Sequence, residues 1–388
     1  MHVALTGATG FLGLRLVREL LERHDSLTLL AHAGSGGALR RITRFFELTG
    51  APAALITELP KRLRVVETDL SRPRIGLSSA DFQRLADELD VIWHSAGNIN
   101  LDDDLVKLRR VNVEGTRNVL ALAAAGGRKP MVHHISTAFV AGARRDGVAY
   151  EDELDDALGF ENAYERSKYE AEIMVREWSR THGRPVVVLR PSILVSDLPP
   201  HPELPEHPLQ FVDQIFRTVL CRLDMAGVGI AEGHRPVMRM TGSPHGHLNL
   251  LPVDHAASVM VRLASRQPSG CVDTYHVVHD HDVPVPVIVA LLERLAPMRL
   301  ELVEHRPYDL TPLEAAADLY PGFTPYLSHR RRFDDTRVRT LLGASLSGVH
   351  VDLDYLIAGV AAVEQPCPRA PFGPSHLDGD PLVPLEMR

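Results

Sequence analysis

The chain has few lysines and few cysteines, and each shortage bears on which kinds of protein the sequence can encode. Only four of its 388 residues are lysine, at positions 61, 107, 129 and 168, so arginine supplies nearly all of its positive charge. The cysteines are odd in number and far apart, at positions 221, 271 and 367, which predicts neither a disulfide framework nor a metal site. A reducing, cytoplasmic setting is the simplest expectation.

The chain also lacks long apolar runs and an excess of basic charge. No apolar run reaches the roughly 18 residues that a membrane-spanning helix needs. The first expected strand begins at His2, which leaves no room for a signal peptide. The net charge of −8 argues against a dedicated nucleic-acid binder, which usually carries a basic stripe. We therefore expect no membrane or nucleic-acid partner, and either a monomer or a homodimer.

Apolar runs alternate with segments of helical spacing over the first half of the chain. We expect strands at 2–7, 27–32, 62–70, 91–97, 131–140 and 185–195. We expect helices at 11–24, 37–48, 80–89, 102–125 and 163–182. Ser78 and Ser79 are candidate caps for the third of these helices. This alternation of near-continuous apolar strands with helices predicts an α/β fold built on a doubly wound parallel sheet.

The pattern changes after residue 195. A proline-rich loop at 198–208 is followed by a helical pattern at 209–223 and by mixed short elements up to about residue 363, including an expected strand at 274–279. We interpret 1–195 as a dinucleotide-binding domain and 196–363 as a smaller, partly interleaved substrate domain. The proline-rich tail, 364–388, lacks periodicity and is expected to be extended or disordered.

Gly7, Gly10 and Gly13 stand directly after the first strand, at the start of the first helix. Glycine allows a tight turn and lets the backbone approach a pyrophosphate, while the N-terminus of the helix offers free N–H groups and partial positive charge. A lone glycine pattern is weak, but this one has the strand and helix that the dinucleotide fingerprint requires. We therefore expect a Rossmann-type nicotinamide site.

The choice of dinucleotide depends on the second strand. NAD sites usually place an acid there for the ribose hydroxyls. This chain has Ala31 and His32 instead, and Arg40, Arg41 and Arg44 follow within two turns, although each arginine could equally be a solvated helix residue. The pattern favours NADP, with NAD possible. Asp69, at the end of the third strand, could accept from the adenine amine or cap the turn before Ser71.

Tyr164 and Lys168 lie four residues apart in a helical segment and therefore share one face. A free tyrosine has a pKa of about 10, which a nearby ammonium would lower by stabilising the phenolate. Ser136 and Thr137, at the end of the fifth expected strand, are candidate hydroxyl donors, because parallel sheets bind ligands at the carboxyl ends of their strands. Together these residues predict a site for proton transfer to a carbonyl oxygen.

The segments TGATGFLG, HSAG, VNVEGT, HISTAFVAG, YERSK and LRPSI resemble the extended short-chain dehydrogenase/reductases over about the first 195 residues. The resemblance implies Thr137 and Tyr164 as donors to the reacting oxygen, and Lys168 on the nicotinamide ribose. Asn112 matches a family position that bears on Lys168 through a water. On these grounds the expected cofactor-binding set is Gly7, Thr9, Gly10, Phe11, Leu12, Gly13, His32, Arg40, Arg41, Asp69, Leu70, Ser95, Ala96, Gly97, Tyr164, Lys168, Pro191 and Ile193.

Within that family, the stretch 68–97 is similar to the branch that reduces thioesters, which includes fatty acyl-CoA reductases and the terminal reductase domains of carboxylic acid reductases and peptide synthetases. This resemblance implies reduction of an acyl thioester to an aldehyde and in some cases an alcohol. The branch usually has arginine after the second strand, where this chain has Ala31 and His32. Because the sequence begins at the first strand, we expect either a carrier-bound substrate that arrives in trans or a free coenzyme A ester.

Two alternatives remain on the same scaffold, a nucleotide-sugar epimerase and a hydroxysteroid-type dehydrogenase. An epimerase would favour an acid after the second strand, which is missing. A sugar dehydratase would carry Asp-Glu after the catalytic threonine, where Ala138 and Phe139 stand. A non-catalytic binding protein on this fold typically loses the tyrosine or the lysine, and both are present here.

Other charged residues invite functional interpretations that the sequence supports less well. The histidine pairs at 245 and 247 and at 279 and 281 lack a partnering cysteine or glutamate at ligand spacing, so we expect no metal. His133 and His134 are expected to be structural, although one could face the site. The run Arg330–Arg332 could meet the phosphates of coenzyme A or of a carrier arm, or could be an exposed run.

Overall fold

The computed structural model describes residues 1–32, 37–210, 235–296, 298–317, 321–343 and 349–360. The expected helix at 209–223 and the tail at 364–388 lie almost wholly or wholly outside these residues. Seven parallel strands form the central sheet, in the order β12-β7-β5-β4-β1-β2-β3. Their bounds are β1 Val3–Thr6, β2 Leu27–His32, β3 Leu63–Thr68, β4 Val91–His94, β5 Met131–Ile135, β7 Val186–Pro191 and β12 Val272–Val277.

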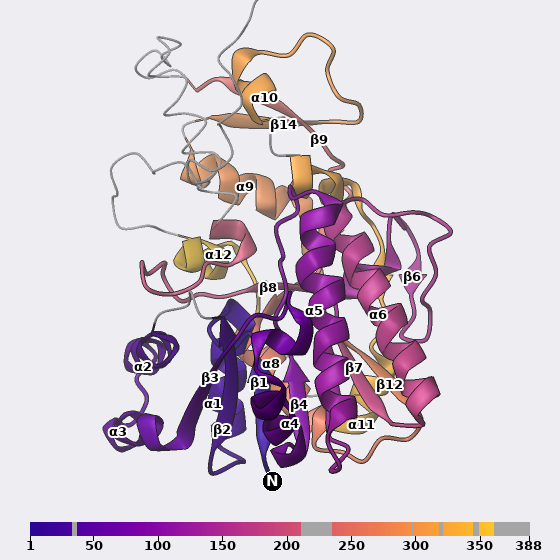
Figure 1. Ribbon diagram of the computed structural model, residues 1–388. Helices are drawn as coiled ribbons and strands as arrows, with labels where there is room; N and C mark the ends of the chain where they lie inside the picture. Colours follow the sequence, from indigo (N-terminus) through magenta and orange to yellow (C-terminus); the bar gives the residue numbers. More distant parts are fainter. Residues whose placement is uncertain (33–36, 211–234, 297, 318–320, 344–348, 361–388) are drawn as a thin grey trace, which may run out of the picture.

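Helices cover both faces of the sheet, as a doubly wound fold requires (Figure 1). One apolar core joins the sheet to α1, α2 and α8, and a second joins it to α4, α5 and α6. The helix bounds are α1 Phe11–Leu21, α2 Ala38–Leu48, α3 Ala53–Arg62, α4 Ser79–Glu88, α5 Leu105–Ala125, α6 Ala163–His182, α8 Val253–Ala264 and α11 Thr336–Leu342. The fold class expected from the sequence is confirmed.

Side-chain caps explain where the helices next to the site begin. Ser78 accepts a hydrogen bond from the amide of Asp81 at 3.1 Å, which confirms the first of the two expected caps of α4. Asp104 caps α5 in the same way, and Asn162 caps α6 by accepting from the amide of Glu165 at 3.0 Å. Gly183 ends α6 in the left-handed conformation, with φ of 59°. The polar residues at these ends therefore set the position of the helix that carries Tyr164.

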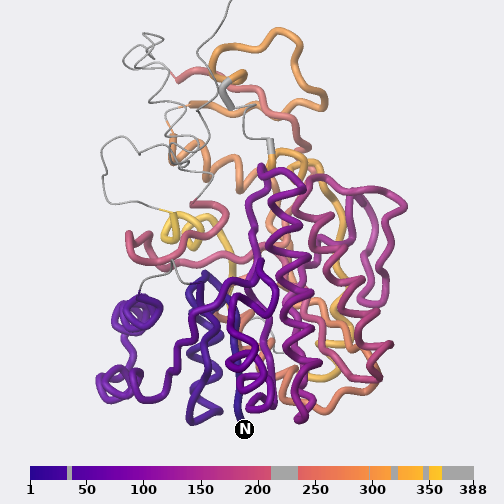
Figure 2. The backbone as a smooth tube through the Cα atoms, viewed as in Figure 1, coloured from indigo at the N-terminus to yellow at the C-terminus, as the bar shows by residue number. Residues whose placement is uncertain are grey.

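A third apolar core lies above the sheet and is built mainly from residues after 195, together with Ala138 and Phe139. In Figure 2, some of the orange and yellow later segments lie above the indigo and purple first half, and others lie beside it. The return includes β12, which pairs with β7, and this is the interleaving that the sequence predicts. The elements outside the main sheet are η1 Pro73–Gly76, η2 Ala138–Ala141, β6 Val148–Ala149, β8 Ile193–Val195, β9 Val237–Thr241, β10 His247–Leu248, β11 Leu250–Pro252, β13 Val283–Pro284, α9 Val285–Leu295, β14 Arg299–Val303, α10 Pro312–Ala317, η3 Pro321–Ser328, β15 Arg332–Phe333 and α12 Leu353–Val360.

Three local expectations differ from the structure. Strand β5 ends at Ile135 rather than at residue 140, because the chain turns at Thr137, whose hydroxyl accepts from the amide of Phe139 at 3.3 Å. The expected strand at 185–195 is two strands that separate at Ser192, whose amide instead donates to the Val277 carbonyl at 3.2 Å. Helix α3 was not expected, and it contains Pro60 near its end.

Candidate active site

A cavity of about 630 Å³ lies above the carboxyl ends of the central strands and contains most of the predicted site. Its walls come from the glycine turn, from the ends of β4, β5 and β7, from α6 and from the later segments. The predicted site residues that line it are Gly7, Gly10, Phe11, Leu12, Gly13, Ser95, Gly97, Ser136, Thr137, Tyr164, Lys168, Pro191 and Ile193. The structure thus brings together residues that lie more than 180 positions apart in the sequence.

The glycine turn has the backbone geometry that a pyrophosphate needs. Gly7 has φ of +73°, a conformation that a residue with a side chain rarely adopts. A Cβ on Gly13 would lie 1.9 Å from the carbonyl oxygen of Gly7, so the turn and the first turn of α1 can pack only if this residue is glycine. Helix α1 has no acidic residue in its first turn. The turn therefore fits a dinucleotide phosphate at a helix N-terminus.

The segment after β4 is held by a chain of hydrogen bonds through His94. Its Nδ1 lies 2.9 Å from the Thr6 hydroxyl, and its Nε2 lies 2.9 Å from the Thr116 hydroxyl. Because Thr116 donates its own proton to the Asn112 carbonyl, Nε2 must carry the proton of a neutral imidazole. Burial lowers the pKa of His94 to about 3, which keeps it neutral. The Thr6 hydroxyl also accepts from the amides of Ser95 and Ala96, which orients this predicted cofactor segment.

Asn112 holds the next part of the same loop. Its Oδ1 accepts from the amide of Asn98 at 2.7 Å, and its Nδ2 donates to the Asn98 carbonyl and to the Ser167 hydroxyl, both at 2.9 Å. The side chain therefore joins α5, the β4–α5 loop and α6 directly. Its expected influence on Lys168 through a water stays a prediction.

Thr137, Tyr164 and Lys168 face the cavity from two elements. Thr137 follows β5, and its hydroxyl lies 3.4 Å from the Pro191 carbonyl. A side-chain hydrogen bond from Thr137 acts on the Tyr164 phenol and opposes the rise in its pKa. Lys168 is buried, and its Nζ donates to the Ile135 carbonyl at 2.7 Å. The two helix residues are therefore positioned against the end of β5.

The expected lowering of the tyrosine pKa is wrong for the protein alone. Burial raises the pKa of Tyr164 to about 12, because it removes water from the phenolate. Burial also lowers the pKa of Lys168 to about 8, against the attraction of Glu172. The phenol is consequently neutral over the physiological range and can donate a proton or a hydrogen bond.

The Ser136 side chain is hydrogen-bonded to a buried ion cluster that the sequence did not predict. Its hydroxyl donates to Oε2 of Glu172 at 2.7 Å. Arg190 contacts both carboxylate oxygens of Glu172, at 2.7 and 3.0 Å, and Arg176 contacts one at 2.8 Å. Burial alone would raise the pKa of Glu172, but the two arginines outweigh it and hold the pKa at about 2. Ser136 is thus tied to this cluster, whereas Thr137 is the hydroxyl next to the phenol.

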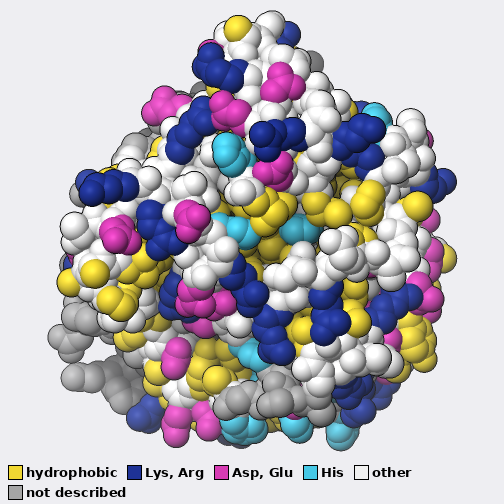
Figure 3. Space-filling model, turned by 90° about the horizontal axis from the view of Figure 1, so that it is seen from below, with side chains coloured by type: hydrophobic (Ala, Val, Ile, Leu, Met, Phe, Trp, Pro, Cys, Tyr) yellow, Lys and Arg dark blue, Asp and Glu magenta, His cyan; other side chains and the backbone are white. Residues whose placement is uncertain are grey.

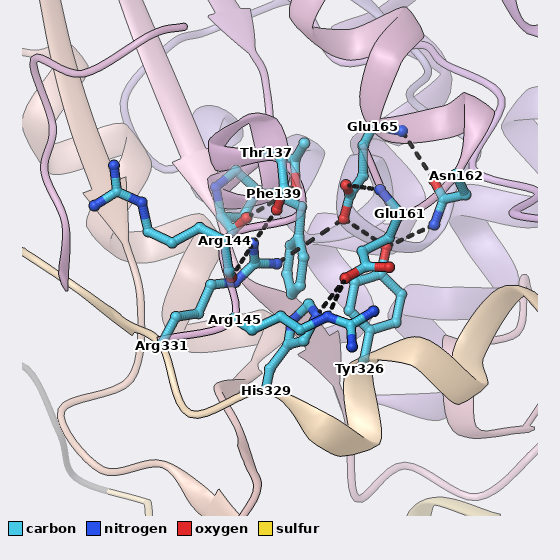
Figure 4. Close-up of polar contacts among 12 residues, drawn as sticks. Thr137, Phe139, Arg144, Arg145, Glu161, Asn162, Glu165, Tyr326, His329 and Arg331 are labelled. Carbon is cyan, nitrogen blue, oxygen red and sulfur yellow. Dashed lines mark hydrogen bonds and ion pairs between the residues drawn. The ribbon is translucent and has the colours of Figure 1, made fainter. Parts of the chain in front are cut away.

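A second buried cluster clamps the N-terminus of α6 (Figure 4). The Tyr326 hydroxyl donates to Oε1 of Glu165 at 2.8 Å and accepts from Nδ2 of the capping residue Asn162 at 2.7 Å. The Arg331 guanidinium lies 3.9 Å from Oε1 of Glu165 and 4.7 Å from the ring centroid of Phe139. Figure 4 shows that these side chains converge between the Thr137 turn and α6. The later segment therefore contacts both the turn after Thr137 and the first turn of α6, which carry the predicted catalytic residues.

This cluster also corrects the view of Arg330–Arg332 as one uniform run. Arg331 is buried at 3% exposure, and it donates to the Gly142 carbonyl. Arg330 is exposed and pairs with Asp146 at 2.7 Å. No local pattern distinguishes the middle arginine, because its hydrogen-bond and ion-pair partners lie more than 160 residues away in the sequence.

The other predicted site residues, all within the described part of the chain, lie outside the cavity lining. They are Thr9, His32, Arg40, Arg41, Asp69, Leu70, Ala96 and Asn112. Asp69 accepts from the amide and the hydroxyl of Ser71, at 3.0 and 2.6 Å, so it caps that turn. Arg40 is exposed in the first turn of α2 and pairs with Glu203. The adenine contact of Asp69 stays a prediction.

Three of the histidines, His133, His247 and His279, have structural partners. His133 is buried with its ring edge-on to Trp93, and burial lowers its pKa to about 3. His247 lies 3.1 Å from Asp282. His279, Asp280 and His281 form a group of ligand-type side chains, but the ring nitrogens of His279 lie 2.9 and 3.0 Å from the carbonyl oxygens of His281 and Val349. These contacts give His279 a structural role, since it holds the segment near residue 349 in place.

The charge distribution on the surface and the character of the helices relate to the expectation of no nucleic-acid and no membrane partner. Basic and acidic side chains are interspersed on the face seen from below the sheet (Figure 3). Among the described helices, none combines the length and the apolar character needed to cross a membrane.

The sequence matches the family model described as Male sterility protein over residues 5–260. It is 29% identical to a linear gramicidin synthase of Brevibacillus parabrevis over 74% of this chain and 5% of that protein. It is 31% identical to a carboxylic acid reductase of Mycobacterium tuberculosis over 72% of this chain and 24% of that protein. The chain thus spans a quarter or less of the length of these relatives.

Two solved structures are similar over nearly the whole chain. The terminal R domain from the myxalamid biosynthetic pathway superposes with a TM-score of 0.70 at 27% identity, covering 93% of this chain and 89% of that one. The reductase domain of a nonribosomal peptide synthetase from Mycobacterium tuberculosis superposes with a TM-score of 0.67 at 25% identity, covering 93% and 90%. The chain therefore belongs to the Male sterility protein family, and its fold is that of these reductase domains.

Proposed function

We propose that this chain uses NADPH to reduce an acyl thioester, presented as a coenzyme A ester or on a carrier protein, to an aldehyde. The observation that carries the proposal is the convergence of Thr137, Tyr164 and Lys168 on one cavity that also reaches the glycine turn. The likeness to a carboxylic acid reductase and to a reductase domain of a peptide synthetase supports the thioester as substrate.

NADPH, when bound, supplies the hydride. The residues of the chain do the rest: the glycine turn and the N-terminus of α1 bind the pyrophosphate, and Lys168 binds the nicotinamide ribose. Thr137 and Tyr164 donate hydrogen bonds to the thioester carbonyl oxygen and stabilise the negative charge that develops on it. The phenol suits this task because its pKa of about 12 keeps it protonated.

The reaction changes the substrate at its carbonyl carbon. This carbon gains a hydride and becomes tetrahedral, its carbon–sulfur bond then breaks, and the carbonyl re-forms as an aldehyde. One thioester, one NADPH and one proton give one aldehyde, one thiol and one NADP⁺. The later segments supply apolar walls for the acyl group, with Met238, Met240 and Phe323 among the lining residues.

The test is a substrate panel of acyl-coenzyme A, acyl-pantetheine and acyl-carrier thioesters, each offered with NADPH and with NADH. We expect loss of nicotinamide absorbance with release of one free thiol per aldehyde formed. A second equivalent of NADPH consumed per thiol would show that reduction continues to the alcohol. Lack of turnover with every thioester, together with NAD retained in the purified protein, would instead favour the epimerase alternative.

A further inference from the structure

The proline-rich loop 198–208 connects the cavity to helix α2. At one end, Glu206, His207 and Pro208 line the cavity. The ring of His207 lies 5.6 Å from that of Phe11 in α1, and its Nε2 contacts the Gly359 carbonyl at 3.2 Å. Further back in the loop, Leu204 packs against the core that includes α1 and α2. These contacts fix the loop beside the first two helices of the dinucleotide half.

This loop places a carboxylate against the arginines of α2. Oε2 of Glu203 lies 3.3 Å from Nε of Arg44, and Oε1 lies 3.9 Å from Nε of Arg40. His201 adds a contact of 3.3 Å between its Nε2 and Nη2 of Arg44. Arg40 and Arg44 are four residues apart, so they share a helix face, and one carboxylate pairs with both.

The contact of Glu203 with Arg40 and Arg44 bears on how the adenosine end of the cofactor would bind. The 2′ position of the adenosine ribose lies just beyond the end of the second strand in a dinucleotide fold, and an arginine near it accommodates a 2′-phosphate. Strand β2 ends at His32 without an acid, and Arg40 is in the first turn of the helix that follows. A 2′-phosphate and the Glu203 carboxylate would thus need the same guanidinium groups.

We propose that Glu203 is a cofactor-selectivity residue, which competes with the 2′-phosphate of NADPH for Arg40 and Arg44 and so narrows the preference for NADPH over NADH. The inference rests on the proposed function in taking NADPH as the cofactor. The competition is modest, because Arg40 is 77% and Glu203 43% exposed and solvent-exposed ion pairs are weak. Removing the carboxylate is expected to raise the affinity for NADPH by about two- to fivefold.

The test is Glu203→Gln in the full chain, with affinities measured by calorimetry for NADPH, NADH, 2′,5′-ADP and 5′-AMP. We expect NADPH and 2′,5′-ADP to bind this variant about two- to fivefold more tightly than they bind the unmodified protein. NADH and 5′-AMP lack the 2′-phosphate, and their affinities should stay unchanged.

Glu47→Gln is the matched control. Glu47 also pairs with Arg44, at 3.2 Å, but it lies on α2 itself and, among the ion pairs of the described residues, forms none with Arg40. An equal effect in this variant would mean general electrostatics and would overturn the inference. So would an unchanged NADPH affinity, or a weaker one, in Glu203→Gln. The binding measurements need no thioester, so they remain decisive even if every thioester in the substrate panel fails.

Discussion

At the residue scale, the proposed chemistry depends on how burial changes the pKa values of two ionisable side chains. Tyr164 has its pKa raised to about 12 and Lys168 has its pKa lowered to about 8, both because the cavity removes water from their charged forms. A neutral phenol is the form that donates to a developing oxyanion. The lysine, held by the Ile135 carbonyl, contributes position and, below a pH of about 8, charge.

Tyr164→Phe is expected to lower kcat by on the order of a hundredfold or more, because the phenylalanine ring keeps the packing but removes the proton donor. Cofactor affinity should change little. Steady-state kinetics and NADPH titration of the same preparation check both statements. Tyr150→Phe, which changes an exposed tyrosine, is the control and should retain full activity. Equal turnover in both variants would remove Tyr164 from the catalytic set.

The sequence predicted Thr137, Tyr164 and Lys168 because their positions depend on local rules. Four residues make slightly more than one helical turn, and a strand end in a parallel sheet marks the ligand edge. The direction of the Tyr164 pKa could not be predicted in this way. Desolvation depends on every wall of the cavity, and some of those walls come from residues after 195.

At the element scale, α6 is the part of the fold on which the site depends. Its first turn is fixed by the Asn162 cap and by the buried contacts of Glu165 with Tyr326 and Arg331. Burial raises the pKa of Glu165, and the attraction of Arg331 opposes that rise. Because Tyr164 directly precedes Glu165, any movement of this turn also moves the phenol.

Tyr326→Phe should reduce the free energy of unfolding by about 1–3 kcal/mol, because it leaves Glu165 and Asn162 each without one buried hydrogen-bond partner. We also expect kcat to fall, because movement of this turn displaces the Tyr164 phenol. NADPH affinity should hold, since the substituted ring still packs on Phe139 and keeps the local packing. Urea unfolding and steady-state kinetics measure the two effects. Tyr308→Phe, at a 99% exposed position, should change neither. Identical values for the two variants would contradict the clamp.

Sequence periodicity predicted α1, α4, α5 and α6 because each has a continuous apolar face. It placed the end of β5 too late, since the turn at Thr137 depends on a hydrogen bond from the Phe139 amide to the Thr137 hydroxyl. It missed the role of Arg331, whose partners come from segments distant in the sequence.

At the scale of the whole molecule, a buried cluster of charges ties the sheet to its helices. Glu172 of α6 contacts Arg190 of β7, and Arg176 reaches Thr274 of β12 at 2.7 Å. Removing one member of such a cluster leaves an opposite charge buried without compensation. Periodicity could not predict this cluster, since acids and arginines at helical spacing are more often solvent-exposed.

Glu172→Gln is expected to lower the free energy of unfolding at pH 7 by about 3–5 kcal/mol. The folded pKa of about 2 lies below the ordinary value of 4.5, so the contribution of Glu172 is complete above pH 4.5 and is lost as pH falls toward 2. The difference between the two proteins should therefore shrink over that interval. Urea midpoints at pH 7, 4 and 3 measure it. The exposed Glu114→Gln variant should match the unmodified protein throughout, and a pH-independent difference in Glu172→Gln would refute the assignment.

The position of β12 at the edge of the sheet has consequences for truncation of the chain and for its folding during synthesis. A fragment that stopped at residue 195 would leave β7 with a bare row of amide and carbonyl groups, the kind of open edge that recruits other chains into aggregates. During synthesis, the ribosome must release residues up to Val277 before the last strand can dock, so nascent protein has to wait for its final partner.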